Sequence, residues 1–424
     1  MQKLPWNEEQ LKDAQKYAAT VCQSDETYFL SVGSGCGILS SIFSATKQNG
    51  EVIMARNCRE AVYHGAELRE LTTHYLYPEM LAEGMMGAVT VEMVEEALEK
   101  YPEAKTMIFI SPTREGIISD VKTIVKAAHA KGVTVIVDES YGAHFLKESG
   151  FAKSAIRCGA DVVIQDAHEN LRAMNQSALL HINKDYRYKE KIRKYLSMFQ
   201  SAGTSSEILQ SIDWMMHWYI EEGREAYKNY LGRLKKLRAA LGTRLTHLKL
   251  LVPENEFDYD ISKVVISVKN CNISGEELGK QLLKKYQIKP EKVSVDYVLF
   301  RTIVTDPEEV YGVLFDALTE IDAALEESPT PVGGREELGQ RKVLMRICEA
   351  VEKKKKYVPL PESLGETSAG YIYIDPPGVP LLTPGEKISE RCVRQLQYYL
   401  EENLKVRGLS KEREIEIVWE EYFT

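Results

Sequence analysis

The chain has 424 residues, of which 44% are hydrophobic and 28% are charged, and its formal net charge is −9. This length accommodates two or three domains with cores of their own. The acidic balance excludes nucleic acid as a main partner, because phosphate groups require a basic face.

The sequence lacks signals for membrane insertion, export or metal binding. No stretch approaches the roughly 18 consecutive apolar residues of a membrane span, and residues 1–6 lack the apolar core of a signal peptide. The seven cysteines lack C-x-x-C spacing, which argues against a zinc site and a disulfide framework. We therefore expect a cytoplasmic protein without a membrane segment or a metal.

From about residue 10 to residue 215 the pattern alternates between strands and helices. Residues 106–110, 133–137 and 161–165 form short apolar runs, which are typical of strands buried on both faces of a parallel sheet. Residues 121–131 have helical periodicity, and Gly132 is placed to end that helix. The region is predicted to be α/β.

A long helical region, 206–245, comes next in the chain. Strands at 263–268 and 297–300 then predict a small α/β unit, and 328–334 is the clearest linker, with two prolines and two glycines. We therefore predict three domains: residues 1–215, residues 216–327 with the connecting helix and small α/β domain, and a C-terminal α+β module at residues 335–424.

Five segments carry motifs in a fixed order: Phe29–Gly37, Ala55–His64, Ser111–Gly116, Val137–His144 and Pro376–Glu386. They resemble the Orn/Lys/Arg decarboxylase patterns F-L-V-N-G-T-T-x-G, R-N-C-H-K-S, S-P-T-Y-E-G, V-D-E-A-H-G-A-H and P-P-G-I-P-L-x-x-P-G-E. The resemblance implies an aspartate-aminotransferase-like large domain, type I among pyridoxal-phosphate folds, with a mostly parallel sheet. It also implies a decarboxylase-type C-terminal domain.

Glu169 is the decisive departure from this family. The family pattern at this point is T-H-K, in which His168 matches the histidine and Glu169 stands in place of the lysine. The resemblance implies that the lysine amine forms a Schiff base with the cofactor, and a carboxylate cannot form one. We therefore expect no cofactor, with non-covalent pyridoxal phosphate left open.

Parts of the implied cofactor pocket are retained. Gly33, Ser34 and Gly35 resemble the phosphate turn, whose backbone N–H groups could hold an anion at a helix N-terminus. Asp138 stands where the family places a carboxylate against the pyridine nitrogen. Because the lysine is missing, the favoured interpretation of Asp138 is a structural carboxylate that accepts hydrogen bonds from the N–H groups of a turn.

Other positions of the pocket are replaced. Arg59 stands in place of the stacking histidine, and Ser140 and Tyr141 replace the A-H pair on the other face. A guanidinium can stack on an aromatic system, so Arg59 does not exclude an aromatic ligand.

Three arginines could converge at the carboxyl edge of the sheet: Arg59, Arg114 and Arg172. The favoured interpretation is a plug, in which a buried Glu169 pairs with one of them where the cofactor would sit. The alternative is an anion pocket for another ligand.

The resemblance also implies sites completed across a dimer. Ser201, in the segment that resembles Q-[ST]-T-S-P, and Glu386 are expected near the partner's site. The family's N-terminal arm has no counterpart in the 28 residues before Phe29.

These features predict a catalytically degenerate homologue that acts as a structural or regulatory subunit. Its partner would be a second copy or an intact decarboxylase paralogue. One alternative is an arginine, lysine or ornithine decarboxylase that needs a partner subunit or non-covalent pyridoxal phosphate. Another is a sensor that binds an amino acid or a polyamine at an acidic rim.

Overall fold

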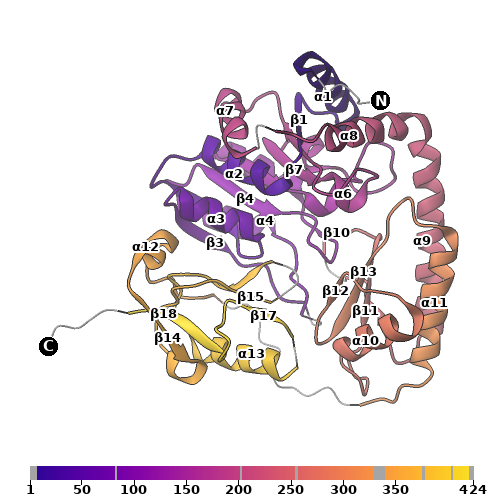
Figure 1. Ribbon diagram of the computed structural model, residues 1–424. Helices are drawn as coiled ribbons and strands as arrows, with labels where there is room; N and C mark the ends of the chain where they lie inside the picture. The colour runs from indigo at the N-terminus through magenta and orange to yellow at the C-terminus, as the bar shows by residue number, and fades with distance from the viewer. Residues whose placement is uncertain are drawn as a thin grey trace.

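A seven-stranded sheet forms the centre of the protein, whose computed structural model describes residues 7–81, 84–200, 203–253, 256–328, 340–374, 378–402 and 404–419 (Figure 1). The strand order is β1-β8-β7-β6-β4-β2-β3. Their bounds are β1 Glu26–Leu30, β2 Glu51–Ala55, β3 Thr72–Leu76, β4 Thr106–Ile110, β6 Thr134–Asp138, β7 Val162–Asp166 and β8 Ala178–Ile182. The strands from β7 to β3 are mutually parallel, whereas β8 is antiparallel to both of its neighbours.

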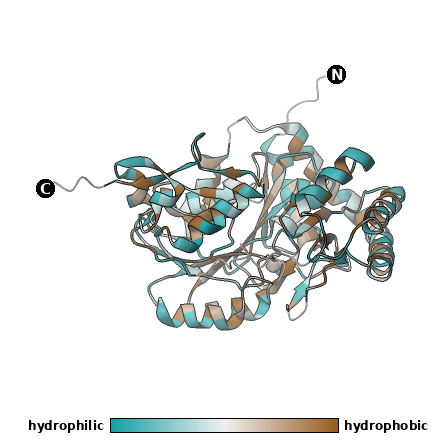
Figure 2. Cartoon of the chain, turned by 90° about the horizontal axis from the view of Figure 1, so that it is seen from below, coloured by the Kyte–Doolittle hydropathy of each residue, from teal (hydrophilic) through white to brown (hydrophobic). Residues whose placement is uncertain are grey.

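The helices of this region cover the sheet with amphipathic faces. They are α1 Glu8–Cys22, α2 Ser34–Ala45, α3 Glu60–Leu68, α4 Val91–Lys100, α5 Val121–Ala130, α7 Lys189–Phe199 and α8 Ser206–Trp218. In α5 the buried residues Val121, Ile124, Val125 and Ala128 share one helical face. Hydrophobic and hydrophilic residues accordingly alternate along the peripheral helices in Figure 2.

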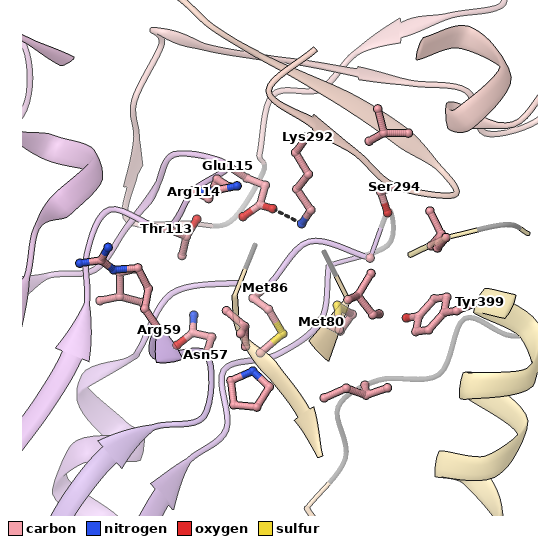
Figure 3. Close-up of a pocket in the computed structure, with 18 of the residues that line it drawn as sticks. Asn57, Arg59, Met80, Met86, Thr113, Arg114, Glu115, Lys292, Ser294 and Tyr399 are labelled. Carbon is pink, nitrogen blue, oxygen red and sulfur yellow. Dashed lines mark hydrogen bonds and ion pairs between the residues drawn. The ribbon is translucent and has the colours of Figure 1, made fainter. Parts of the chain in front are cut away.

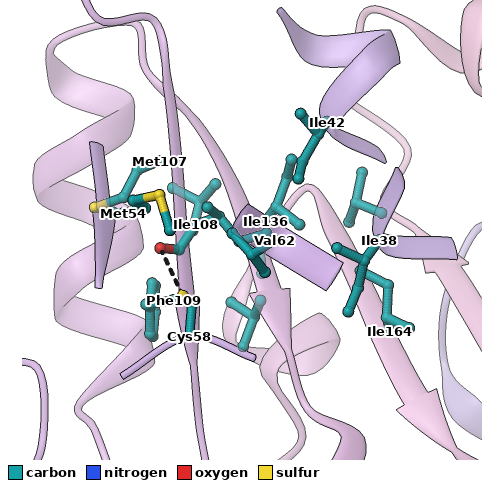
Figure 4. Close-up of a cluster of buried hydrophobic side chains, with 14 of the residues drawn as sticks. Ile38, Ile42, Met54, Cys58, Val62, Met107, Ile108, Phe109, Ile136 and Ile164 are labelled. Atoms are coloured by element: carbon teal, nitrogen blue, oxygen red, sulfur yellow. Dashed lines mark hydrogen bonds between the residues drawn. The ribbon is translucent and has the colours of Figure 1, made fainter. Parts of the chain in front are cut away.

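The main core lies between this sheet and its helices. Ile38 and Ile42 of α2 pack in the same cluster as Ile136 and Ile164 of the central strands (Figure 4). All four side chains are at most 1% exposed. The sheet is therefore a rigid support for the loops at its carboxyl edge.

A second, four-stranded sheet has the order β12-β13-β11-β9. Its strands are β9 Lys249–Leu250, β11 Lys263–Ser267, β12 Lys292–Val293 and β13 Tyr297–Arg301. Helices α9 Arg224–Arg244 and α11 Glu308–Asp322 run side by side next to it, and α10 Gly275–Tyr286 packs on β13 (Figure 1). A short pairing of β10 Asp258–Tyr259 with β5 Ile117–Ile118 joins this region to the loop after β4.

The C-terminal region combines short sheets with two helices. One sheet pairs β14 Lys355–Pro359 with β18 Glu414–Val418, and the other has the order β16-β15-β17. The remaining bounds are β15 Ile372–Ile374, β16 Pro380–Leu382, β17 Val406–Arg407, α12 Ile347–Glu352 and α13 Glu390–Glu401. Within the described ranges no helix has the length and apolar character to cross a membrane.

The α/β prediction is confirmed, and the predicted strands at 106–110, 133–137 and 161–165 match β4, β6 and β7 to within one residue. Gly132 adopts φ +70°, as a residue that ends a helix often does. The predicted helix 206–245 is α8 and α9, joined by a π-helical turn at Tyr219–Gly223. Of the predicted linker 328–334, only Ser328 lies within the described residues, and the three domain boundaries stay predictions.

Candidate functional site

The candidate site lies at the carboxyl edge of the seven-stranded sheet. Asp138 and Asp166 are the last residues of β6 and β7, Ser34 is the first residue of α2, and Arg59 precedes α3. Parallel strands bring such residues together where they end, which is where ligands bind in open α/β sheets.

Arg59 is the centre of this cluster. Its Nε is 2.7 Å from Asp138 Oδ2, and its Nη2 is 3.1 Å from Asp138 Oδ1, so both carboxylate oxygens are occupied. Nη2 also donates to Ser34 Oγ at 2.9 Å and to Ser140 Oγ, while Nη1 lies 3.3 Å from Asp166 Oδ2. The guanidinium therefore bridges the phosphate turn, β6 and β7.

Arg59 stays charged in this cluster. Burial by itself lowers the pKa of Arg59, but the nearby charges of Asp138 and Asp166 outweigh it, and the pKa stays above its ordinary value. Asp138 is fully buried, and Ser140 donates a further hydrogen bond of 2.6 Å to its Oδ1. Arg59, whose side chain is 20% exposed, therefore forms a compensated ion pair with the buried Asp138.

Tyr141 is buried between two of the arginines. Its ring centroid lies 5.9 Å from Cζ of Arg59 and 5.2 Å from Cζ of Arg114, within range for cation–π attraction. Arg114 Nε donates to the Tyr141 hydroxyl at 3.0 Å. Burial raises the pKa of Tyr141, so the hydroxyl stays protonated.

Glu169 follows β7 as expected, but its burial and its ion-pair partner differ from the prediction. It sits in α6 Ala167–Asn170, its side chain is 22% exposed, and its ion-pair partner is Arg301 at the end of β13. Arg301 Nε also lies 3.1 Å from Glu291 Oε2, and His168 Nε2 lies 3.6 Å from Glu169 Oε1. The prediction of a buried Glu169 paired with Arg59, Arg114 or Arg172 is wrong, because the turn of α6 directs the carboxylate toward the smaller sheet.

Arg172 does not join the cluster either. Its Cζ lies 5.0 Å from the ring of Trp214 and 4.9 Å from that of Trp218, so it stacks on α8. Of the three arginines that were expected to converge, only Arg59 and Arg114 flank the site.

The glycine turn has structural reasons to exist. Gly33 adopts φ +84°, which favours glycine, and its N–H donates to Gln176 O at 2.9 Å. A Cβ at Gly37 would lie 2.8 Å from Leu30, whereas one at Gly35 would meet only Ala61 at 3.9 Å. The turn is required by the local backbone and packing, whether or not it holds an anion.

Glu386 has a role within its own chain. It is completely buried, and its two oxygens lie 3.2 Å and 3.1 Å from Nε and Nη2 of Arg56. Both oxygens therefore have a partner within the chain, and the expected position near a partner's site stays a prediction. Ser201 lies outside the described residues.

Sequence reasoning missed Arg56 and Arg301. Arg56 stands in the R-N-C motif, which was a usable signal, but no spacing links Arg301 to Glu169 over 132 positions. Within the described residues, no group of three His, Cys, Asp or Glu side chains could hold a metal ion.

The large parallel sheet with its site at the strand ends defines a type I fold of pyridoxal-phosphate enzymes. The fold is similar to lysine decarboxylase A from Pseudomonas aeruginosa, with a TM-score of 0.82, 17% identity, and 97% of this chain and 72% of that chain covered. It is also similar to the Francisella novicida lysine decarboxylase LdcF, with a TM-score of 0.80, 18% identity and coverage of 97% and 72%.

Residues 1–277 match the family model described as Orn/Lys/Arg decarboxylase, major domain, and residues 345–412 match its C-terminal domain. The arginine decarboxylase of Bacillus subtilis (strain 168) is 27% identical over 405 residues, 94% of this chain and 83% of that protein. The protein YaaO of the same strain is 30% identical over 417 residues, 96% of this chain and 85% of its own length. The chain belongs to the Orn/Lys/Arg decarboxylase family.

This membership corrects the expectation that the chain has no cofactor. Its relatives are named arginine decarboxylases and its structural neighbours lysine decarboxylases, from a family that uses pyridoxal phosphate. The residues present do not fit the family's usual covalent attachment, since Glu169 offers no amine and Arg59 occupies both oxygens of Asp138. Ser34 is likewise bonded to Arg59.

Proposed function

We propose that this chain is a non-catalytic member of the Orn/Lys/Arg decarboxylase family that serves as a subunit of a dimer. Its partner is a second copy or an intact decarboxylase paralogue. The observation that carries the proposal is the Arg59 guanidinium, which binds Asp138, Asp166 and Ser34 in the place of a stacking histidine.

The arrangement of Arg59 is costly to undo. Removing the guanidinium from the cluster would leave the fully buried Asp138 without its cation, and breaking a buried ion pair typically costs about 3–5 kcal/mol. A ligand that binds Asp138 must therefore displace Arg59 and itself compensate the buried carboxylate. Glu169 adds a second obstacle, because a carboxylate forms no imine.

The competing function is a lyase that acts with a partner subunit or with non-covalent pyridoxal phosphate. The retained Asp138 and the turn at Gly33 and Ser34 favour it, because they stand where the family holds the cofactor ring and phosphate. Both functions require the same fold. They differ in whether the chain turns over a substrate.

Release of carbon dioxide decides between them. The purified chain is incubated with added pyridoxal phosphate and with arginine, lysine or ornithine in turn, beside the Bacillus subtilis arginine decarboxylase as a positive control. We expect a rate equal to that of buffer. Turnover by the chain alone, or turnover that the chain adds to a co-expressed paralogue beyond the paralogue's own rate, would contradict the non-catalytic role and favour the lyase.

Three exposed apolar side chains on segments that are joined by hydrogen bonds support the dimer. The loop at Val32 contacts the segment of Met174 through Gly33 and Gln176, and Met174 N bonds to Ser211 of α8. Val32, Met174 and Trp214 are 42%, 51% and 51% exposed. Apolar residues grouped in this way typically mark an interaction surface.

Light scattering tests the assembly. Trp214→Glu should yield monomers, whereas Leu364→Glu, which charges an exposed apolar residue of the C-terminal region, should leave the dimer intact. A wild-type chain that stays monomeric both alone and with a co-expressed paralogue would refute the subunit role.

A further inference from the structure

A cavity of about 130 Å³ lies beside Arg59, where three parts of the chain meet (Figure 3). The loops after β2 and β4, the residues 292–294 of the smaller sheet, and C-terminal residues between 374 and 404 all contribute to its wall. A single water needs roughly 10–15 Å³, so the cavity is larger than one water requires.

Most of the wall is apolar. Two methionines, Met80 and Met86, face the middle of the cavity (Figure 3). Further apolar wall residues are Ile110, Val293, Pro380 and Leu381. Thioether side chains adapt to ligands of varied shape, so this wall suits an aliphatic or aromatic body.

Two polar groups on the wall have unused hydrogen-bonding capacity. Arg114 uses its Nε for the Tyr141 hydroxyl, and the same nitrogen lies 3.7 Å from Glu291 Oε1. Within the described residues, neither of its Nη groups has a hydrogen bond. Asn57 is 4% exposed, and its Oδ1 has no hydrogen-bond partner in that same part of the chain. A buried polar atom without a partner is unfavourable, so a ligand that satisfies it gains affinity.

Among the described wall residues one carboxylate is present, that of Glu115, and it already has partners within the chain. Glu115 Oε1 lies 2.5 Å from Lys292 Nζ and 2.9 Å from the Tyr297 hydroxyl. Burial raises the pKa of Glu115, but the ammonium of Lys292 outweighs it and the pKa is lowered. A guanidinium or ammonium side chain of a ligand would therefore find no free carboxylate here.

We infer that this cavity binds a small carboxylic acid with an apolar body and a hydrogen-bond donor beside the carboxylate, which is an apolar α-amino acid or α-hydroxy acid. The ligand carboxylate lies against the Nη groups of Arg114, whose planar fork matches its geometry. The adjacent ammonium or hydroxyl donates to Asn57 Oδ1, and the body packs on Met80 and Met86.

This inference goes beyond the non-catalytic role and does not depend on it. It differs from the expected acidic rim for polyamines, because the wall presents Arg114, and its one described carboxylate, Glu115, is paired with Lys292. Since three parts of the chain line the cavity, an occupant holds them together and stabilises the folded protein.

Calorimetric titration of the full chain provides the test. The probes are L-leucine and 2-hydroxy-4-methylpentanoate, which separate the two sources of the ligand, with L-arginine, L-lysine and agmatine as basic comparisons. We expect saturable binding of at least one of the first two and none of the basic compounds. No saturation by either apolar acid, or tighter binding of a basic compound, would overturn the inference.

Three variants test the individual contacts. Arg114→Met should weaken binding at least about tenfold, because a charge-assisted hydrogen bond is lost. The control Arg193→Met removes an arginine of α7 that pairs with Glu26, and it should bind as wild type. Asn57→Leu should abolish the preference for the probes over 4-methylpentanoate, which has no donor beside its carboxylate.

The folding of each variant is checked as well. Circular dichroism and unfolding curves identify a variant that has lost its fold, and Arg114→Lys then replaces Arg114→Met, with weaker binding than wild type expected. Unchanged affinity in a folded Arg114 variant would place the ligand elsewhere and refute the site. The titration measures binding and not turnover. Its result can therefore be interpreted in the same way for a chain that proves to be a decarboxylase.

Discussion

At the residue scale, the properties of a guanidinium explain the cluster at the strand ends. Arginine carries five N–H donors in a rigid plane, and Arg59 directs them at Asp138, Asp166, Ser34 and Ser140 at once. A histidine has two ring nitrogens and changes charge near neutral pH, so it could not satisfy four partners in this way. Arginine at position 59 therefore places a permanent cation where the family has a histidine, whose charge changes with pH.

Restoring the amine alone should not restore the reaction. In Glu169→Lys the new ammonium would lie beside Arg301, in place of the present ion pair, while Arg59 would still occupy Asp138. Positioning and electrostatic contributions are each worth several kcal/mol in catalysis. We expect carbon dioxide release from arginine, lysine and ornithine to equal that of the matched control Glu169→Gln, which also lacks the ion pair. A clear excess over that control would show that the pocket is still competent.

At the scale of elements, one buried ion pair attaches the C-terminal region to the large sheet. Arg56 follows β2, and besides Glu386 it donates to Pro380 O at 2.5 Å and to Leu381 O at 3.2 Å, both in β16. Glu386 in turn accepts from Thr383 N at 3.0 Å. Since Pro380 and Leu381 line the cavity beside Arg59, this pair also sets the position of its C-terminal wall.

Glu386→Gln should destabilise the protein by about 3–5 kcal/mol, because it leaves the fully buried Arg56 without a counter-charge. Urea unfolding measures the free energy. The neighbouring exposed residue provides the control, and Lys387→Gln should change the stability by less than about 0.5 kcal/mol. Equal effects of the two substitutions would mean that the ion pair contributes little.

At the scale of the whole molecule, a buried polar chain connects three strands of the sheet. Glu139 accepts from Gln165 Nε2 at 2.6 Å, Gln165 Oε1 lies 3.0 Å from His181 Nε2, and His181 Nδ1 lies 2.9 Å from Thr27 Oγ1. Burial lowers the pKa of His181 to about 3, so the imidazole stays neutral in the fold. The unfolded chain protonates the same ring near its ordinary value of about 6.5.

Stability should therefore fall with acidity through His181. Below about pH 6.5 the unfolded state binds one more proton at this ring than the folded state, so the contribution of His181 to the free energy of unfolding decreases as the pH drops, by about 1.4 kcal/mol per pH unit. Glu139, whose pKa burial raises to about 7, contributes in the opposite direction in wild type and variant alike. His181→Gln retains hydrogen-bonding groups without titrating. From about pH 6.5 to pH 5 it should lose about 2 kcal/mol less than wild type. His64→Gln, which alters an exposed histidine, should follow wild type, and the same course for His181→Gln would contradict the assignment.

The fold was predictable where burial alone determines the pattern. The strands β4 and β7 are buried along their whole length, and β6 is buried at all positions after Thr134, so their apolar runs identify them. The motifs also located Arg59 and Asp138 at the same sheet edge. The partner of Glu169 was not predictable, because Arg301 reaches it from another part of the fold, and such pairing depends on how those parts pack. The R-N-C motif singled out Arg56, but nothing in the sequence paired it with Glu386.

The four partners of Arg59 have a consequence for the history of this family member. A reversal of position 59 to histidine would leave Asp138 and Asp166 buried without a cation, and a reversal of Glu169 to lysine would oppose Arg301. Substitutions that share partners do not act additively, so the effect of either change depends on the other. Rebuilding the family's pattern at positions 59 and 169 would therefore require both changes together, with new partners for Asp138 and Arg301.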